Sequence, residues 1–453
     1  MSNSGGFSAM VGNPPYLGGQ KLSGTYGLPF REFLVNVVAQ KSGSIDLGTY
    51  FLISIFNKLE ADGAFGVVAT NTIAQGVNRE IGLESILEKG GIITDAKRNK
   101  KWGEGASVVV HLLTVSNGNS NVDPMLDGEL VTGINSMLED DSILSGTPVK
   151  LSQNANICFQ GSVILGDGFM LTPEERAQFV AQNPRNSEVI KPCMGGRDLG
   201  NRPDGSASRY VIDFGHLTVN QAMAYPELYS RVETMVKPER DVNKSNQRRL
   251  NWWKFGAQAK KLYEQIANLD TVIAVPETST FCKMRMVHSD QVFMHSLKVF
   301  ATNNTGFYGV LLSTVHDLWV NKYTATLGSG RRYQPTSCFE TFPFPSEENM
   351  QLISPLAVSF DELRSSYMIS EDIGITECYN RINDPINQDS QIQELRNAIV
   401  KLDLAVIRSY GWNDLVVNHQ FTEFEGKTNW SFPTELQNKI LQNLLEINLG
   451  HEE

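Results

Sequence analysis

Four consecutive residues near the start of the chain, Asn13-Pro14-Pro15-Tyr16, combine an amide, two prolines and an aromatic ring. Proline fixes its own φ and keeps the preceding residue out of the helical region, so the backbone of Asn13 and Pro14 must be extended and stiff. The Asn13 side-chain oxygen and a neighbouring backbone carbonyl then form a pair of acceptors, which suits an amino group with two hydrogens to donate. Tyr16 offers a flat face for stacking. These residues predict a binding loop for a planar base that carries an exocyclic amino group.

A second group of candidates lies in the middle of the chain, where residues 237–261 hold eight basic and two acidic side chains. Clustered cations beside aromatic rings are typical of a surface that contacts nucleic-acid phosphates. The candidates are Lys237, Arg240, Lys244, Arg248, Arg249, Trp252, Lys254, Lys260 and Lys261. The alternative is a solvated helix face with a tryptophan docked in the core, and for Trp253 the two interpretations are equally open.

Three further arginines lie in irregular, glycine-rich surroundings: Arg197, which precedes Asp198, and the pair Arg331 and Arg332. An arginine fork can donate to the edge of a guanine, so these loops are expected to read bases. The five cysteines lie far apart with no histidine at ligand spacing. We therefore expect no metal site, and we expect reduced thiols of the cytoplasm.

The elements that must position Asn13 follow it along the chain. Residues 43–64 predict a buried helix that is ended by Gly63, and residues 65–76 predict a buried strand that ends in a polar loop. Residues 79–91 predict an amphipathic helix, and two strands are expected at 91–99 and 106–116. This alternation indicates an α/β sheet, but only about half of a complete one.

The rest of the chain changes character. One short helix is expected at 129–139 within a polar connector, and short strands and turns follow up to about residue 345. Two long helices are expected at 392–412 and 434–450, where apolar residues recur every three or four positions.

Composition and charge limit the possible classes of protein. The chain has 453 residues, 41% hydrophobic and 20% charged, which predicts two or three globular domains. Residues 339–453 hold 19 acidic and 7 basic side chains, whereas residues 1–338 hold 31 and 32, so the net charge of −11 belongs to the tail. No run is long enough to span a membrane, and the start has no signal-peptide pattern.

The sequence resembles the methylase and target-recognition parts of type IIG restriction–modification proteins and of related phage-defence methylases. In this class, S-adenosylmethionine donates a methyl group to the N6 amino group of adenine in DNA. The stretches that carry the resemblance are GNPPY, NTIAQG, WGEGASVVVHLLTV, VKPER, RRLNWWKFG, RRYQPTSCFETFPFP and AVIRSYGW. They extend over nearly the whole chain and occur in the order of that class, in which the recognition region follows the catalytic sheet.

The resemblance implies a fold and a division into domains. Residues 1–118 would be the C-terminal half of a class I, Rossmann-like α/β methyltransferase domain, and 119–155 a connector. Residues 156–345 would form a mixed α+β target-recognition domain that binds double-stranded DNA, and 346–453 a helical C-terminal region.

The resemblance also implies roles for single residues. Asn13 and Pro14 would accept hydrogen bonds from the amino group of an adenine flipped out of the duplex, and Tyr16 would stack on that base. Asp46 matches a polar position near the S-adenosylmethionine pocket, although it could serve as a helix N-cap. Asn71, followed by Thr72, could line the same pocket or cap a turn.

The Gly-rich cofactor loop of this family is expected outside this chain. The Gly-rich loop that holds S-adenosylmethionine precedes the proline motif in this class, and only twelve residues precede Asn13. Glycine clusters at 191–200 and 326–333 follow no long apolar strand and are expected to be turns. We therefore expect cofactor binding only with an N-terminal methylase half or subunit that supplies the loop, and we expect a split or truncated methylase.

Two other functions remain open at this point. The chain could be a non-catalytic DNA-binding or specificity subunit, or a fragment of one. It could instead methylate a protein glutamine or an RNA base, but the recognition region of roughly 190 residues argues against small methylases of that kind.

Overall fold

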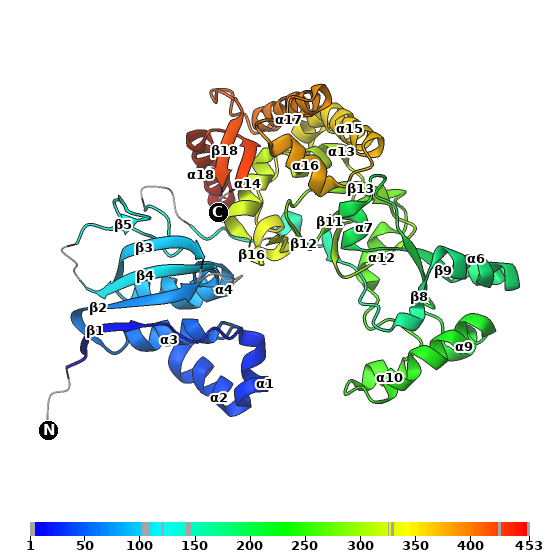
Figure 1. Cartoon of the computed structure of the whole chain (residues 1–453), viewed down its shortest axis with the longest axis horizontal. Helices are drawn as coiled ribbons and strands as arrows, with labels where there is room; N and C mark the ends of the chain where they lie inside the picture. Colours follow the sequence, from blue (N-terminus) through cyan, green and yellow to red (C-terminus); the bar gives the residue numbers. More distant parts are fainter. Residues whose placement is uncertain are drawn as a thin grey trace. The chain divides into compact units, whose positions relative to one another are not determined.

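The computed structural model describes residues 5–101, 109–118, 122–141, 146–324, 326–327, 330–424 and 427–450. The chain divides into two compact units (Figure 1). The first unit is Met1–Pro148 with Tyr323–Ser329, and the second unit is Val149–Lys322 with Gly330–Glu453. The first unit therefore includes most of the expected connector, and the second unit joins the expected recognition region to the C-terminal helices.

A six-stranded sheet forms the centre of the first unit. Its strands are, in spatial order, β1 (Phe7–Gly12), β2 (Leu59–Thr70), β4 (Val109–Asn117), β3 (Gly91–Lys101), β5 (Met125–Leu126) and β6 (Glu129–Leu130). β1 runs parallel to β2, whereas β4 is antiparallel to both β2 and β3. Among the described strands β1 pairs with β2 alone, so its other edge is open.

Helices pack on this sheet and form the core with it. The helical segments are η1 (Gly19–Lys21), α1 (Leu22–Tyr26), α2 (Leu28–Phe33), η2 (Leu34–Ala39), α3 (Leu47–Phe56), η3 (Asn71–Ala74), α4 (Gly76–Arg79), η4 (Glu80–Glu84) and α5 (Ser85–Glu88). Leu52 and Phe56 of α3 are buried in one cluster with Phe65 and Val67 of β2 and Leu113 of β4. This cluster fixes α3 against the strand that follows it in the chain (Figure 1).

One expected boundary and one expected helix in this unit are wrong. The helix that begins at Leu47 ends at Phe56, and Gly63 lies inside β2, because β2 extends beyond the buried stretch and pairs with β1 from Leu59 onward. Residues 129–139 do not form a helix. The Asn135 side chain accepts hydrogen bonds from the backbone N–H groups of Met137 and Glu139, and Leu138 has a φ of 58°, so a tight turn replaces it.

The second unit contains two four-stranded sheets. The first has the order β14 (Val292–Phe293), β9 (Ile190–Met194), β10 (Arg209–Ile212) and β8 (Met170–Leu171). The second has the order β13 (Arg285–His288), β11 (Thr271–Pro276), β15 (Leu297–Phe300) and β7 (Cys158–Gln160). Around them lie α6 (Pro173–Gln182), α7 (Gly196–Asn201), α8 (Val219–Ala222), α9 (Pro226–Met235), α10 (Lys237–Asp241), α11 (Asn246–Leu250) and α12 (Lys260–Ile266). The short strand β12 (Thr278–Ser279) pairs with β17 (Gly330–Arg332).

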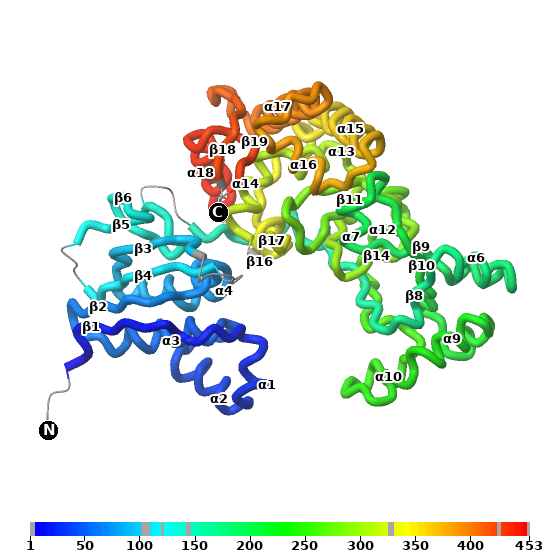
Figure 2. Tube along the Cα trace, viewed as in Figure 1, coloured from blue at the N-terminus to red at the C-terminus, as the bar shows by residue number. Residues whose placement is uncertain are grey.

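Helices dominate the C-terminal part of the same unit. They are α13 (Thr305–Leu312), α14 (Thr314–Tyr323), α15 (Glu347–Ser370), α16 (Ile375–Asn383), α17 (Ser390–Ser409) and α18 (Thr434–Gly450). α15 packs against both α13 and α17. A hairpin of β18 (Gln420–Phe424) and β19 (Lys427–Ser431) lies beside α18, where Gln437 donates a hydrogen bond to Thr422 (Figure 2).

Candidate active site and DNA interface

The proline motif begins directly after β1, which ends at Gly12. Pro14 is buried, whereas Asn13 and Tyr16 are exposed. The Tyr16 hydroxyl donates a hydrogen bond of 2.6 Å to Asn13 Oδ1. Gly48, in the first turn of α3, lies next to both prolines, and an added Cβ would be in ordinary van der Waals contact with them. The prolines thus pack against α3, whereas the Asn13 amide and the Tyr16 ring are exposed.

Asp46 connects this loop to two other elements. It is the N-cap residue of α3, but its side chain does not cap the helix. Instead Oδ1 accepts from the backbone N–H of Gly19 at 3.3 Å, and Oδ2 accepts from the Thr72 hydroxyl at 2.7 Å. The side chain of Asp46 is therefore not a helix cap. Its carboxylate joins Gly19, which follows the proline loop, to Thr72 of η3, which follows β2.

Asn71 lies on the same corner, as the first residue of η3 after β2. Its neighbour Thr72 contacts Asp46, and a hydrogen bond joins the Asn71 backbone to the buried side chain of His111. Burial, followed by the charge of Arg98, lowers the pKa of His111 to about 4. A neutral imidazole thus lies beneath this corner at neutral pH.

Two residues missed by the sequence analysis stabilise the corner. Asn78 Oδ1 accepts from the backbone N–H of Asp46 at 2.7 Å and from the Thr49 hydroxyl at 3.1 Å. His111 accepts from the backbone N–H of Asn99 at 3.1 Å. An isolated amide at a helix start and an isolated histidine in a strand carry no local signal, because their partners are distant in the sequence.

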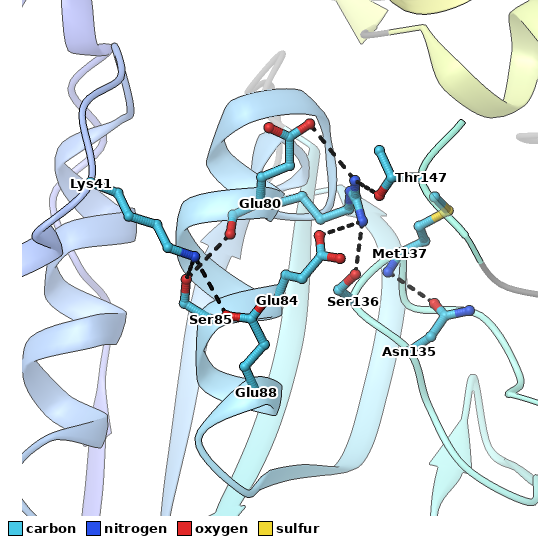
Figure 3. A network of polar contacts seen from close by, with 10 residues as sticks. Lys41, Glu80, Glu84, Ser85, Glu88, Asn135, Ser136, Met137 and Thr147 are labelled. Atoms are coloured by element: carbon cyan, nitrogen blue, oxygen red, sulfur yellow. Dashed lines mark hydrogen bonds and ion pairs between the residues drawn. The ribbon is translucent and has the colours of Figure 1, made fainter. Parts of the chain in front are cut away.

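Arg79 follows Asn78 and is the centre of a polar network, whose partners Glu84, Ser136 and Thr147 are labelled in Figure 3. Its buried guanidinium donates to Glu84 at 2.8 Å, to Ser136 at 3.0 Å and to Thr147 at 2.9 Å. Thr147 is close to the last residue of this part of the first unit, Pro148. Arg79 therefore ties the connector to α4, the helix whose Asn78 contacts Asp46.

Two residues of the expected phosphate-binding surface are in the core. Arg240 is 3% exposed, and its guanidinium donates to the backbone carbonyls of Ile164 and Leu165. Trp252 is 7% exposed and packs edge-on against Tyr229. The expectation that Arg240 and Trp252 contact DNA is therefore wrong, since a buried side chain with protein partners cannot reach a phosphate.

The remaining residues of that surface are accessible. Lys244 and Arg249 are exposed, and Arg248 and Lys254 are half-buried. Trp253 is half-buried, and its indole N–H donates to the Leu217 carbonyl at 3.0 Å. The interpretation of Trp253 as a residue docked on the core fits this contact.

The structure brings the arginines expected to read bases into one part of the second unit. Arg197 is exposed on α7, and its neighbour Gly196 donates to the Ser296 side chain at 3.0 Å. The Ser296 carbonyl accepts a hydrogen bond from the backbone N–H of Glu277. The Glu277 carboxylate forms an ion pair with Arg332 at 2.9 Å. Arg331 is half-buried beside it on β17.

Within the described residues, no group of three or more metal-ligating side chains is close enough to hold an ion. None of the described helices has the length and apolarity needed to cross a bilayer.

Two family models match different parts of this chain. Residues 1–93 match the model described as Eco57I restriction-modification methylase, and residues 140–346 match the model described as MmeI, target recognition domain. These matches confirm the resemblance to restriction–modification methylases that carry a target-recognition domain.

Individual proteins agree with these matches. DNA methyltransferase A of Bacillus subtilis (strain 168) is 24% identical over 425 residues, which are 88% of this chain and 45% of that protein. The type IIL restriction–modification enzyme MmeI, solved in complex with DNA, is 21% identical with a TM-score of 0.75 over 98% of this chain and 57% of its own. The chain thus spans about half the length of these relatives. The fold class is confirmed as a methyltransferase sheet followed by a mixed recognition domain and helices.

Proposed function

We propose that this chain is the methylase and target-recognition part of a site-specific DNA adenine-N6 methyltransferase of a restriction–modification or phage-defence system. The observation that carries the proposal is the stiff loop of Asn13, Pro14 and Tyr16 at the end of a parallel strand, with its amide and ring outward. Ligands bind at such strand ends in α/β sheets. The names of the two similar proteins, a DNA methyltransferase and a restriction–modification enzyme bound to DNA, support this proposal.

The loop would hold the amino group of an adenine flipped out of the duplex. Asn13 Oδ1 and the Pro14 carbonyl accept its two hydrogens, which orients the nitrogen lone pair toward the methyl donor. Asn13 Oδ1 accepts from the Tyr16 hydroxyl, and its second lone pair can accept from the base. In this proposal the Tyr16 ring moves to stack on the adenine, so base binding exchanges the Tyr16 hydrogen bond for one from the base.

S-adenosylmethionine, when bound, supplies the methyl group. The residues on this chain that we propose to lie near it are Asp46 and Asn71. Asp46 fits this role because each of its half-buried carboxylate oxygens accepts one hydrogen bond and can accept another from an ammonium or hydroxyl group.

We further propose that a cofactor-binding methylase half, with its Gly-rich loop, completes the sheet at β1. The open edge of β1 offers unpaired backbone groups, and its side chains include Val11 at 91% and Phe7 at 57% exposure. An exposed apolar strand edge is a ready template for another strand. The half could precede this sequence in a longer protein or be a separate subunit.

Double-stranded DNA is the proposed partner of the second unit. Lys244, Arg248, Arg249 and Lys254 would contact phosphates, which gives affinity and salt dependence. Arg197, Arg331 and Arg332 would lie nearer the base edges. In this proposal the methylase half is 1–118, the connector 119–155, the recognition domain 156–345 and the helical region 346–453, and the protein acts in the cytoplasm, where its DNA is.

The test is identification of the product. The chain is combined with its cofactor-binding half, S-adenosylmethionine and duplex DNA, and the nucleosides are analysed by mass spectrometry. N6-methyladenine is expected. A methylated cytosine would overturn the adenine assignment, and tight DNA binding without any transfer would favour the second candidate, a specificity subunit that does not catalyse transfer.

A further inference from the structure

A cavity of about 340 Å³ opens in the basic segment of the second unit. Its walls come from the end of α11 and from the loop that follows Trp253, and Phe255 contributes an apolar wall. This volume falls at the lower end of the range of small-molecule pockets, about 300–1,000 Å³. It is therefore large enough for a planar ring with a phosphate.

Positive charge surrounds this cavity. Arg248 and Lys254 line it, and neither forms an ion pair with a carboxylate among the described residues. Arg240 lies behind the wall, where it donates to the Lys254 carbonyl at 3.4 Å. Burial, and then the charge of Arg248, lower the pKa of Arg240. An anion placed here would relieve this like-charge repulsion.

The cavity also presents fixed acceptors. Asn251 Nδ2 donates to the Gln247 carbonyl at 3.0 Å, and Gln258 Nε2 donates to the Gly215 carbonyl at 2.6 Å. Both amides line the cavity, and each of these contacts uses one hydrogen of the amide nitrogen, so each amide oxygen can accept from a ligand. A phosphodiester group has no hydrogens for these oxygens, whereas a base with an amino group does.

We propose that this cavity binds one nucleotide of the DNA, with its phosphate at Arg248 and Lys254 and the amino group of its base at Asn251 and Gln258. The cavity would then determine one position of the recognition sequence, in addition to supplying affinity. This inference rests on the DNA binding in the proposed function, but not on methyl transfer.

A selection from a random duplex library, followed by sequencing, tests the proposal with the full chain. The wild type should enrich one motif. Asn251→Ala and Gln258→Ala should each relax the same single position, whereas Arg248→Gln should lower binding at every sequence and leave the motif unchanged. The matched control is Gln178→Ala, which removes an exposed amide of α6 outside the cavity.

A second measurement avoids dependence on the folding of the variants. The amino group of the base at the relaxed position is removed chemically, and binding of this DNA is compared with that of the unmodified DNA. Wild-type affinity should fall between about 5- and 150-fold, and each amide variant should show a smaller difference between the two DNAs than the wild type does. A motif that is the same in wild type and amide variants would overturn this inference alone. Failure of the wild type to bind DNA would overturn it together with the DNA-binding part of the proposed function.

Discussion

Replacing Tyr16 should change base capture in opposite directions, depending on the replacement. The Tyr16 hydroxyl donates a hydrogen bond of 2.6 Å to Asn13 Oδ1, the oxygen proposed to accept from the adenine amino group. An intramolecular hydrogen bond contributes about 0.5–1.5 kcal/mol net, and this one is exposed, so the lower part of that range, about 0.5–1 kcal/mol, applies. Tyr16→Phe removes the competing donor and keeps the ring. Base capture should strengthen by about 2- to 5-fold.

Tyr16→Ala removes the ring as well. Stacking of a base on an aromatic side chain contributes about 1–3 kcal/mol, which exceeds the hydrogen bond that is relieved. Capture should therefore weaken, by roughly 5- to 150-fold before that relief is subtracted.

The assay is the fluorescence of 2-aminopurine placed next to the target adenine. This fluorescence rises when the target adenine leaves the stack, and the target base keeps the N6 amino group that Asn13 binds. The fluorescence is measured with the chain and its cofactor-binding half, and Tyr26→Phe is the control because Tyr26 is another exposed tyrosine of the first unit. Weaker capture by Tyr16→Phe would refute the exchange of hydrogen bonds. Unchanged capture by Tyr16→Ala would refute the stacking role.

Three further predictions concern stability, and urea unfolding measures each. Arg79→Ala should lower the free energy of unfolding of the first unit by about 2–3 kcal/mol. This is less than the about 3–5 kcal/mol expected for a fully buried ion pair, because Glu84 is partly exposed. An unchanged unfolding midpoint would contradict the role of the network. Trp252→Ala should destabilise the second unit by about 3–5 kcal/mol, as expected of a core side chain, whereas a loss of DNA affinity at full stability would restore the phosphate-surface interpretation. The pKa of His111 is about 4 in the folded chain against an ordinary 6.5, so as the pH falls the unfolded chain takes up the proton first. The contribution of neutral His111 to the free energy of unfolding is therefore complete above pH 6.5 and is lost as the pH falls toward 4. His111→Gln should flatten that pH dependence, and an equal slope would contradict it.

The proline loop could be predicted from sequence because its stiffness is local. Two prolines determine the backbone wherever the rest of the chain lies, so the exposed amide and ring followed from four residues. The same holds for the long amphipathic helices, α17 and α18, whose apolar spacing is repeated over many residues.

Burial of single charged or aromatic residues could not be predicted in this way. Arg240 and Arg248 occur in the same basic segment, yet one donates to carbonyls more than seventy residues away and the other lines a cavity. Only the folded chain distinguishes them. The expected helix at 129–139 was wrong for a local reason, since the Asn135 side chain binds the backbone that a helix would need.

The most direct test of the central claim is methyl transfer by Asn13→Ala, measured with the cofactor-binding half beside a DNA-binding titration. The substitution removes the acceptor that aligns the amino nitrogen, and a displacement of about 1 Å lowers a rate by about a hundredfold. Transfer to adenine should fall by at least this factor while DNA affinity stays constant, and Asn57→Ala, which removes an exposed amide of the same unit, should leave both unchanged. Normal transfer by Asn13→Ala would contradict the account and remove the proline loop from catalysis.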